Sequence, residues 1–209
     1  MFTDRAEAGN ELAERIAAMQ LADPVVLALP RGGVPVAVPV AARLGAPLDL
    51  ILVRKIGVPG HEELAAGALV EGAEPVFNPD VLRMTGRTEA DFARMVERKR
   101  AEIAARRSLY LAGRAPVPLA GRTAVVIDDG IATGASMRAA LKGLAQREPA
   151  RIVLAVPVAP RDALEALRAL VDDIVCLEMP DFFYAVGAHY REFGQVSDDE
   201  VARAMAAAA

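Results

Sequence analysis

The stretch Val125–Met137, which reads VVIDDGIATGASM, decides the fold. Residues 124–128, AVVID, are predicted to form a strand. Their apolar, β-branched side chains are typical of a strand buried on both faces of a parallel sheet. Two adjacent carboxylates, Asp128 and Asp129, close that strand, and a glycine-rich turn leads into a helix expected to begin near Gly134. A strand, a tight turn and a helix in direct succession indicate a layered α/β fold.

The same turn has the chemistry of a sugar-phosphate site. A helix N-terminus presents free N–H groups at the positive end of the helix dipole, so it attracts phosphate. Thr133 and Ser136 add hydroxyl donors. The two carboxylates would repel phosphate, so we expect their partners to be hydroxyl groups. Phosphate beside a vicinal diol describes a ribose 5-phosphate. Ordinary turn formation explains each residue singly but not the ordered set.

A second strand–helix–strand unit precedes this one. Residues 25–29 form a continuous apolar run, and a helix over 34–44 and a strand over 48–53 follow it. A crossover helix joins strands that run in the same direction, so we expect these two strands to be parallel. The other predicted elements are helices over 4–20, 134–146, 161–170 and 197–205 and strands over 151–158 and 173–177. The pattern predicts one α/β domain over 1–209, with a central, mainly parallel sheet flanked by helices.

Composition excludes several classes of protein. Hydrophobic residues make up 54% of the 209 residues and aromatic residues 4%, so the core should be large and aliphatic. The net charge of -4 argues against a general nucleic-acid binder. A single cysteine, Cys176, excludes an internal disulfide and a cysteine-rich metal site. No uncharged apolar stretch reaches about 18 residues, and the first residues resemble an amphipathic helix. We therefore expect a cytoplasmic protein whose partners include neither a membrane nor a nucleic acid.

The segment 83–114 stands out by its charge. It carries nine Arg and Lys against four Asp and Glu, a net charge of +5. Thr88 and Asp91 fit a capping box, so a long helix should begin there. The apolar stripe of this helix consists of Phe92, Val96, Ile103 and Tyr110. Two interpretations of the charge stay open: a solvated helix face, which we prefer, and a cover that helps to attract an anionic ligand.

The stretch 125–137 closely resembles the binding motif of type I phosphoribosyltransferases, a hydrophobic run, two acidic residues and a Thr/Gly/Ser-rich turn into a helix. Residues 29–34, LPRGGV, resemble the pyrophosphate loop of that family. Arg54 and Lys55 end the second predicted strand with two cations, as in several members, and 56–63 match the flexible loop that closes over the substrate. Two rival phosphate motifs are excluded, because the chain has neither GxxxxGK[ST] nor the three-glycine spacing of dinucleotide folds.

The resemblance implies a Mg²⁺-dependent transferase. In this family a nitrogen nucleophile, usually a nucleobase or similar heterocycle, displaces pyrophosphate from phosphoribosyl pyrophosphate. Asp128 and Asp129 are implied to hold the ribose hydroxyls and to place the magnesium, directly or through water, and Lys55 and Glu63 complete the implied catalytic set. The implied donor-binding residues are Arg31, Gly32, Gly33, Arg54, Lys55, Asp128, Asp129, Gly130, Ala132, Thr133, Gly134, Ala135 and Ser136.

The sequence indicates the acceptor less specifically than it indicates the donor. Enzymes of this family that act on 6-oxopurines carry an Asp where this chain has Ala132, which weakens a hypoxanthine or guanine assignment. A general acid or base would then come from the loop residues 61–63. The implied acceptor site is the aromatic set Phe182, Phe183 and Tyr184 together with Tyr190, although packing within the hood explains these rings equally well. We expect His189 to be structural rather than catalytic.

The resemblance also implies how the domain is organised. The expected parts are a core over 25–178, a flexible loop region over 56–77, a helical insertion over 83–114, and a small hood with a C-terminal helix over 179–209. The peptide between Pro30 and Arg31 is expected to be cis, and the protein a homo-oligomer, as a dimer. One alternative function stays open, a regulatory or sensor protein that binds phosphoribosyl pyrophosphate without catalysis. A phosphoribosyl pyrophosphate synthase would need an ATP site, and the sequence shows none.

Overall fold

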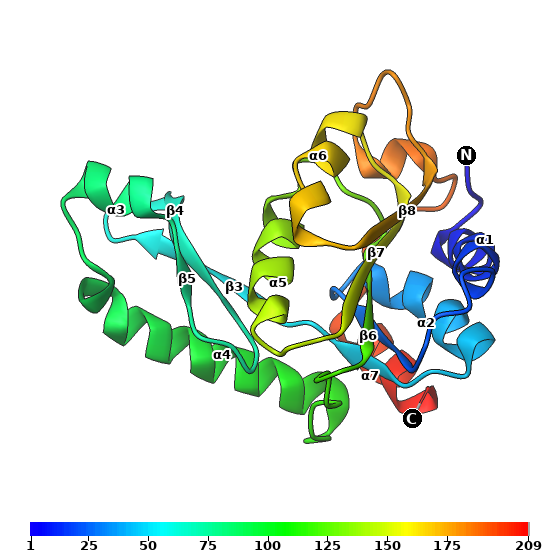
Figure 1. Ribbon diagram of the computed structural model, residues 1–209, viewed down its shortest axis with the longest axis horizontal. Coiled ribbons are helices and arrows are strands. Elements are labelled where there is room, and N and C mark those ends of the chain that lie inside the picture. The colour runs from blue at the N-terminus through cyan, green and yellow to red at the C-terminus, as the bar shows by residue number, and fades with distance from the viewer. Residues whose placement is uncertain (209) are drawn as a thin grey trace.

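A five-stranded parallel sheet forms the centre of the molecule (Figure 1). The computed structural model describes residues 1–208. Strand order in the sheet is β2-β1-β6-β7-β8. The bounds are Pro24–Ala28 for β1, Leu48–Leu50 for β2, Thr123–Ile127 for β6, Arg151–Val158 for β7 and Asp173–Glu178 for β8. Every pairing in this sheet is parallel, so the prediction of an α/β fold with parallel first strands is confirmed.

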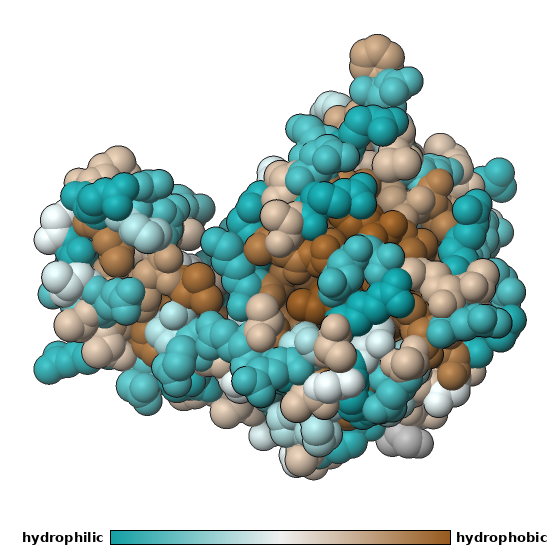
Figure 2. Space-filling view, viewed as in Figure 1, coloured by the Kyte–Doolittle hydropathy of each residue, from teal (hydrophilic) through white to brown (hydrophobic). Residues whose placement is uncertain are grey.

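Helices cover both faces of this sheet, because alternate strand residues point to opposite sides. Val26 and Val125 pack toward α1 (Arg5–Ala17) and α2 (Gly33–Leu44). Val25 and Val126 pack toward α5 (Ala135–Ala145) and α6 (Arg161–Glu165), which a short 3₁₀ helix follows at Arg168–Leu170. The side chains on both faces are chiefly Val, Leu, Ile and Ala, as the composition predicts. In Figure 2 an apolar area lies over the β7 and β8 side of this core.

A second, antiparallel sheet extends away from the core as an arm (Figure 1). It consists of β3 (Val53–Val58), β4 (His61–Val70) and β5 (Val76–Phe77). The prediction of an exposed loop over 56–63 is therefore wrong, and the predicted strand over 48–53 is two strands in different sheets. The sequence IGVPGHEE carries the residues of turns, yet only Pro59 and Gly60 lie between β3 and β4, with Gly60 at a φ of 84°.

Helices complete the arm. α3 spans Pro79–Thr85, a 3₁₀ turn spans Glu89–Phe92, and α4 spans Ala93–Leu111. The capping box of Thr88 and Asp91 is confirmed, and the four residues of the predicted apolar stripe are buried. Near its C-terminal end α4 is fixed to the core by Arg107, which is buried and makes ion pairs with Asp49 and Glu71. Much of the remaining surface along α4 is hydrophilic (Figure 2).

The residues after β8 form a loop and a helix that pack against different parts of the molecule. Residues 179–196 form a loop with a 3₁₀ turn at Val186–His189, and this loop is joined to the N-terminus by a bridge between Phe2 and Tyr190. α7 (Asp198–Ala207), capped by Ser197 as predicted, packs instead against α4 and α2. Within residues 1–208, no helix is both long and apolar enough to cross a bilayer.

Candidate functional site

The turn between β1 and α2 is built by close backbone packing. Its peptide between Pro30 and Arg31 is cis, as the sequence resemblance implied. A Cβ on Gly33 would lie 2.7 Å from the carbonyl oxygen of Ile127, and a Cβ on Gly32 would lie 2.1 Å from Oδ2 of Asp129. Only glycine permits this approach, so the two glycines bring the turn against the end of β6.

The turn between β6 and α5 is open by comparison. The side chains of Ala132, Thr133, Ala135 and Ser136 are exposed, and α5 begins at Ala135. Gly134 precedes the helix with a φ of 74°, a conformation that favours glycine. The first N–H groups of α5 have no partner within the helix, so they point toward the space beside Thr133 and Ser136. This turn can accept a phosphate group.

The two turns lie next to each other because β1 and β6 are neighbours in the sheet. Ala28 pairs with Ile127 in parallel register, so both strands end at the same edge. Leu29 donates its backbone N–H to the carbonyl of Ile127 at 2.9 Å. The structure thus brings together two segments that are about 100 residues apart in sequence, at the carboxyl edge where parallel sheets bind ligands.

Asp128 and Asp129 lie between these turns in different environments. Nε of Arg5 donates to Oδ2 of Asp129 at 2.8 Å, so the carboxylate of Asp129 has a partner from α1. Burial, reinforced by the charge of Asp129, raises the pKa of Asp128 well above its ordinary value. The hydroxyl of Tyr190 donates to the backbone carbonyl of Asp129 at 2.6 Å, and burial raises the pKa of that hydroxyl. Segments near both ends of the chain therefore contact Asp129.

A cavity of about 370 Å³ lies between the β1–α2 turn, the start of β3, α4 and the first turn of α5. Its charged lining residues are all cations, namely Arg31, Arg54, Lys55 and Arg106, and its other lining residues are Leu29, Pro30, Ile51, Leu52, Val53, Tyr110, Ser136 and Ala139. Arg31, Arg54, Lys55 and Ser136 are predicted donor-binding residues. Arg106 and Tyr110 come from α4 and were not among the residues that the sequence indicated for the site. The basic segment 83–114 thus contributes one cation to the cavity, and both interpretations of its charge stay predictions.

A second cavity of about 410 Å³ adjoins the first through Arg31. It is lined by Arg5, Arg31, Gly32, Asp129, Phe193, Gly194, Gln195 and Val196. The guanidinium of Arg5 lies 3.8 Å from the ring centre of Phe193 and donates to the carbonyl of Gly194. Arg5 and Phe193 were also missed, and only the position of Phe193 in the predicted hood segment could have pointed to it.

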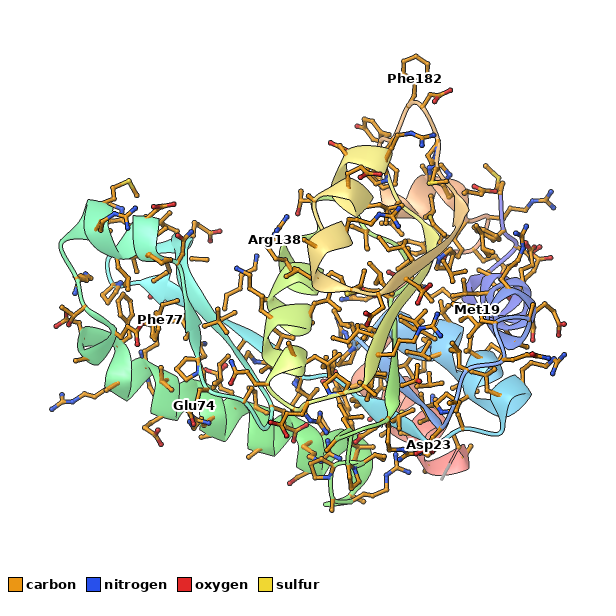
Figure 3. All side chains as sticks on the ribbon, in the orientation of Figure 1. Met19, Asp23, Glu74, Phe77, Arg138 and Phe182 are labelled. Carbon is orange, nitrogen blue, oxygen red and sulfur yellow. The ribbon has the colours of Figure 1, made fainter. Side chains whose placement is uncertain are left out.

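The predicted acceptor residues lie apart from both cavities. Phe182 and Tyr184 are 96% and 95% exposed, and Figure 3 shows Phe182 at the tip of the hood loop, pointing away from the core. Phe183 stacks on His189 with ring centres 5.7 Å apart. Tyr190 is buried and packs on Phe2 and Phe193. The structure does not bring these rings together as one platform.

The predicted acid–base residues are on the arm. His61, Glu62 and Glu63 are exposed at the start of β4, and none of the three lines either of these two cavities in the described part of the chain. Lys55, in contrast, lies in β3 and lines the first cavity. His189 pairs with Glu178 at 3.2 Å, in keeping with a structural role.

Carboxylate oxygens at the sheet edge suit a magnesium ion that arrives with a phosphate ligand. Mg²⁺ is commonly held by one or two carboxylates, with water and substrate phosphates as its other ligands. Among the residues that the structure describes, no group of three or more His, Cys, Asp or Glu is arranged to hold a metal alone. Asp128 and Asp129 can supply only part of a coordination shell, and the rest would come from the ligand.

Comparisons with known proteins agree with this geometry. A family model described as a phosphoribosyl transferase domain matches residues 3–192. Two Mycobacterium tuberculosis proteins, from strains H37Rv and CDC 1551, are each 48% identical to this chain over 204 residues. They are named "Putative phosphoribosyl transferase Rv0571c" and "Putative phosphoribosyl transferase MT0597". Each match covers 96% of this chain but 45% of the relative, so the chain spans about half the length of these proteins. The crystal structure of TT1426 from Thermus thermophilus is similar over 98% of this chain and 97% of that one, with 46% identity and a TM-score of 0.86.

Proposed function

Because this chain belongs to the phosphoribosyl transferase domain family, we propose that it transfers the 5-phosphoribosyl group of phosphoribosyl pyrophosphate to a nitrogenous acceptor and releases pyrophosphate. One observation carries the proposal. The β6–α5 turn, which suits a sugar phosphate, lies beside the β1–α2 turn and a cavity whose charged lining residues are all cations. A ligand with a phosphate at one end and a pyrophosphate at the other fits this arrangement, with the phosphate at the β6–α5 turn and the pyrophosphate at the β1–α2 turn and the cavity.

Each part of the donor has a proposed partner. The amides and hydroxyls of 132–136 hold the 5-phosphate, and Asp128 and Asp129 accept hydrogen bonds from the ribose hydroxyls, with Gly130 as the next residue of the same turn. Arg31, Gly32, Gly33, Arg54 and Lys55 face the pyrophosphate. Positive charge at that end stabilises the negative charge that develops on the leaving group.

The reaction replaces the bond between the anomeric carbon and the pyrophosphate oxygen by a bond to the acceptor nitrogen. The bonding electrons leave with the pyrophosphate, and the acceptor supplies the new pair. Magnesium bound with the donor would add charge stabilisation to the leaving group, and the carboxylates of Asp128 and Asp129 are the residues that would help to hold it. Lys55 acts as a cation toward the leaving oxygen.

The acceptor side requires movement. Glu63 can exchange a proton with the acceptor only if the arm bends toward the sheet edge, and Phe182, Phe183 and Tyr184 can contact a planar acceptor only if the hood loop folds inward. Lids of this kind are common in enzymes that exclude water. Ala132 leaves no carboxylate beside the 5-phosphate turn, so we favour an acceptor other than a 6-oxopurine, and we also propose a homodimer.

The test is an acceptor screen that measures pyrophosphate release from phosphoribosyl pyrophosphate and Mg²⁺. We expect release with at least one heterocyclic acceptor, and loss of release when both Asp128 and Asp129 are replaced by Asn. Asp162→Asn, a change in the first turn of α6, is the matched control. Donor binding without release for any acceptor would favour the sensor alternative, and absence of donor binding would contradict the proposed function.

A further inference from the structure

A carboxylate of α7 pairs with two of the cations that line the first cavity. Both oxygens of Asp198 accept hydrogen bonds from Nη1 of Arg106, at 2.8 and 2.7 Å, and Oδ1 also accepts one from the hydroxyl of Tyr110 at 2.6 Å. Nη1 of Arg31 lies 3.6 Å from the same Oδ1. Asp198 therefore links three cavity residues that come from the β1–α2 turn and from α4.

Arg31 and Arg106 both line the cavity, whereas Asp198 does not. The side chains of Arg106 and Asp198 are each 36% exposed, so a ligand in the cavity can reach the same guanidinium groups. The hydrogen bond from Tyr110 and the charge of Arg106 hold the pKa of Asp198 below its usual range, so Asp198 is ionised at neutral pH.

Resting on the proposed function, we propose that Arg106 and Tyr110 bind the pyrophosphate end of the donor, and that Asp198 is the internal anion which this group displaces. Arg31, Arg54, Lys55 and Arg106 place four cations around one cavity, and their mutual repulsion is reduced while Asp198 pairs with two of them. A pyrophosphate carries more charge and more acceptor oxygens than one carboxylate, so it can replace Asp198 on Arg31 and Arg106. The hydroxyl of Tyr110 can then donate to a phosphate oxygen.

Displacement of Asp198 by a ligand would also change how α7 packs. Asp198 is in the first turn of α7, and α7 packs on α4 and α2. α2 begins directly after the turn that contains Arg31, and α4 carries Arg106. The two helices that α7 packs on therefore both belong to the surroundings of the cavity. Release of Asp198 loosens α7 when the site fills, whereas a purely structural contact stays in place.

The test compares variants of opposite expected sign, with inorganic pyrophosphate and then phosphoribosyl pyrophosphate with Mg²⁺ as probes in calorimetry. Arg106→Gln should weaken binding of both about tenfold or more, because a charge-assisted contact is lost. Arg106→Lys, which keeps the charge, should recover part of that loss. Asp198→Asn should tighten binding about three- to tenfold, because the competing anion is removed. Arg100→Gln is the matched control on the same helix, since Arg100 pairs with Glu74 and Glu97 on the arm, and it should bind like the wild type.

Each outcome decides the inference. If Asp198 only supports the fold, Asp198→Asn lowers the melting temperature and leaves affinity unchanged or weaker, which overturns the displacement. Wild-type affinity in Arg106→Gln, with donor binding intact, overturns this inference alone. A wild-type protein that binds neither probe overturns both this inference and the proposed function. If Asp198→Asn melts earlier yet binds more tightly, the displacement stands, because loss of an ion pair that only supports the fold does not raise affinity.

Discussion

Two strand-to-helix turns meet at the same edge of the sheet, and they are built in opposite ways. The β1–α2 turn is closed, because a Cβ on Gly33 would lie 2.7 Å from the carbonyl oxygen of Ile127. The β6–α5 turn is open, and the nearest atom to a Cβ on Gly134 would be a Leu167 methyl at 3.5 Å. The first turn consists of tightly packed backbone, whereas the second exposes hydroxyls and free helix amides. A site of this kind can tolerate side-chain variation in one turn and almost none in the other.

The largest effect should come from an added methyl group in the closed turn. Gly33→Ala forces the backbone of β6 to move, and overpacking of this kind lowers the free energy of unfolding by about 2–3 kcal/mol. Gly134→Ala meets no close atom and should cost about 1 kcal/mol from its left-handed backbone. Urea unfolding of both variants measures the difference. Equal losses would show that the two turns are not packed differently.

Next in size is the effect of the carboxylates between the turns on donor affinity. Asp129→Asn should weaken binding of phosphoribosyl pyrophosphate at least about tenfold, since each hydrogen bond to a charged group is worth roughly 1.5–3 kcal/mol. Calorimetry in the presence of Mg²⁺ checks this, with Asp173→Asn, at the start of β8 and far from the turns, as the control. If both Asp128→Asn and Asp129→Asn bind the donor like the wild type, the assignment of these residues is wrong.

A smaller effect should follow from removing hydroxyls in the open turn. Thr133→Ala and Ser136→Ala should each weaken donor binding about three- to tenfold, because each removes one hydroxyl donor to the 5-phosphate, which water can partly replace at this exposed turn. Neither change should alter unfolding, since both side chains are exposed. The measurement is donor affinity together with the melting temperature. Loss of stability without loss of affinity would contradict an open, ligand-binding turn.

The smallest effect concerns pH. The pKa of Asp128 is raised in the folded protein, so protonation of Asp128 favours folding, and that contribution is present below the pKa of about 4 of an unfolded Asp. The contribution is lost as pH rises through the folded-state pKa. We therefore expect Asp128→Asn to be more stable than the wild type at pH 8, by a few degrees in melting temperature, and the gain to shrink toward pH 4. A stability difference that does not depend on pH would contradict the raised pKa.

The local sequence pattern was enough to predict the two turns and the parallel sheet, except for where its strand β2 ends. β1, β6 and β7 carry apolar runs rich in Val, and the turns carry their own glycines and hydroxyls, so residues near in sequence contain the information. The arm was harder, because Gly57, Pro59 and Gly60 suggest a loop although residues on both sides form a hairpin. Periodicity did identify the buried stripe of α4, and the residue pattern identified the capping box of the 3₁₀ turn that precedes it.

The contacts that sequence reasoning missed are long-range pairs of charges. Arg5 reaches Asp129 from a helix 124 positions earlier, and Asp198 reaches Arg106 across 92 positions. Neither arginine belongs to a motif, and both lie on helices whose many charges are typical of a solvated face. Only the packing of α1 against the core, and of α7 against α4, selects these particular side chains.

Asp129 is contacted by both Arg5 and Tyr190, and this bears on when a newly made chain can bind the proposed donor. The ribosome delivers the N-terminal part of a domain first, so Arg5, β1 and β6 are available well before the hood. Tyr190, which donates a hydrogen bond to the carbonyl of Asp129, leaves the ribosome 61 residues after Asp129. We therefore expect a nascent chain that stops short of Tyr190 to contain the whole parallel sheet and yet hold its two turns loosely, so that affinity for the donor is acquired late in synthesis.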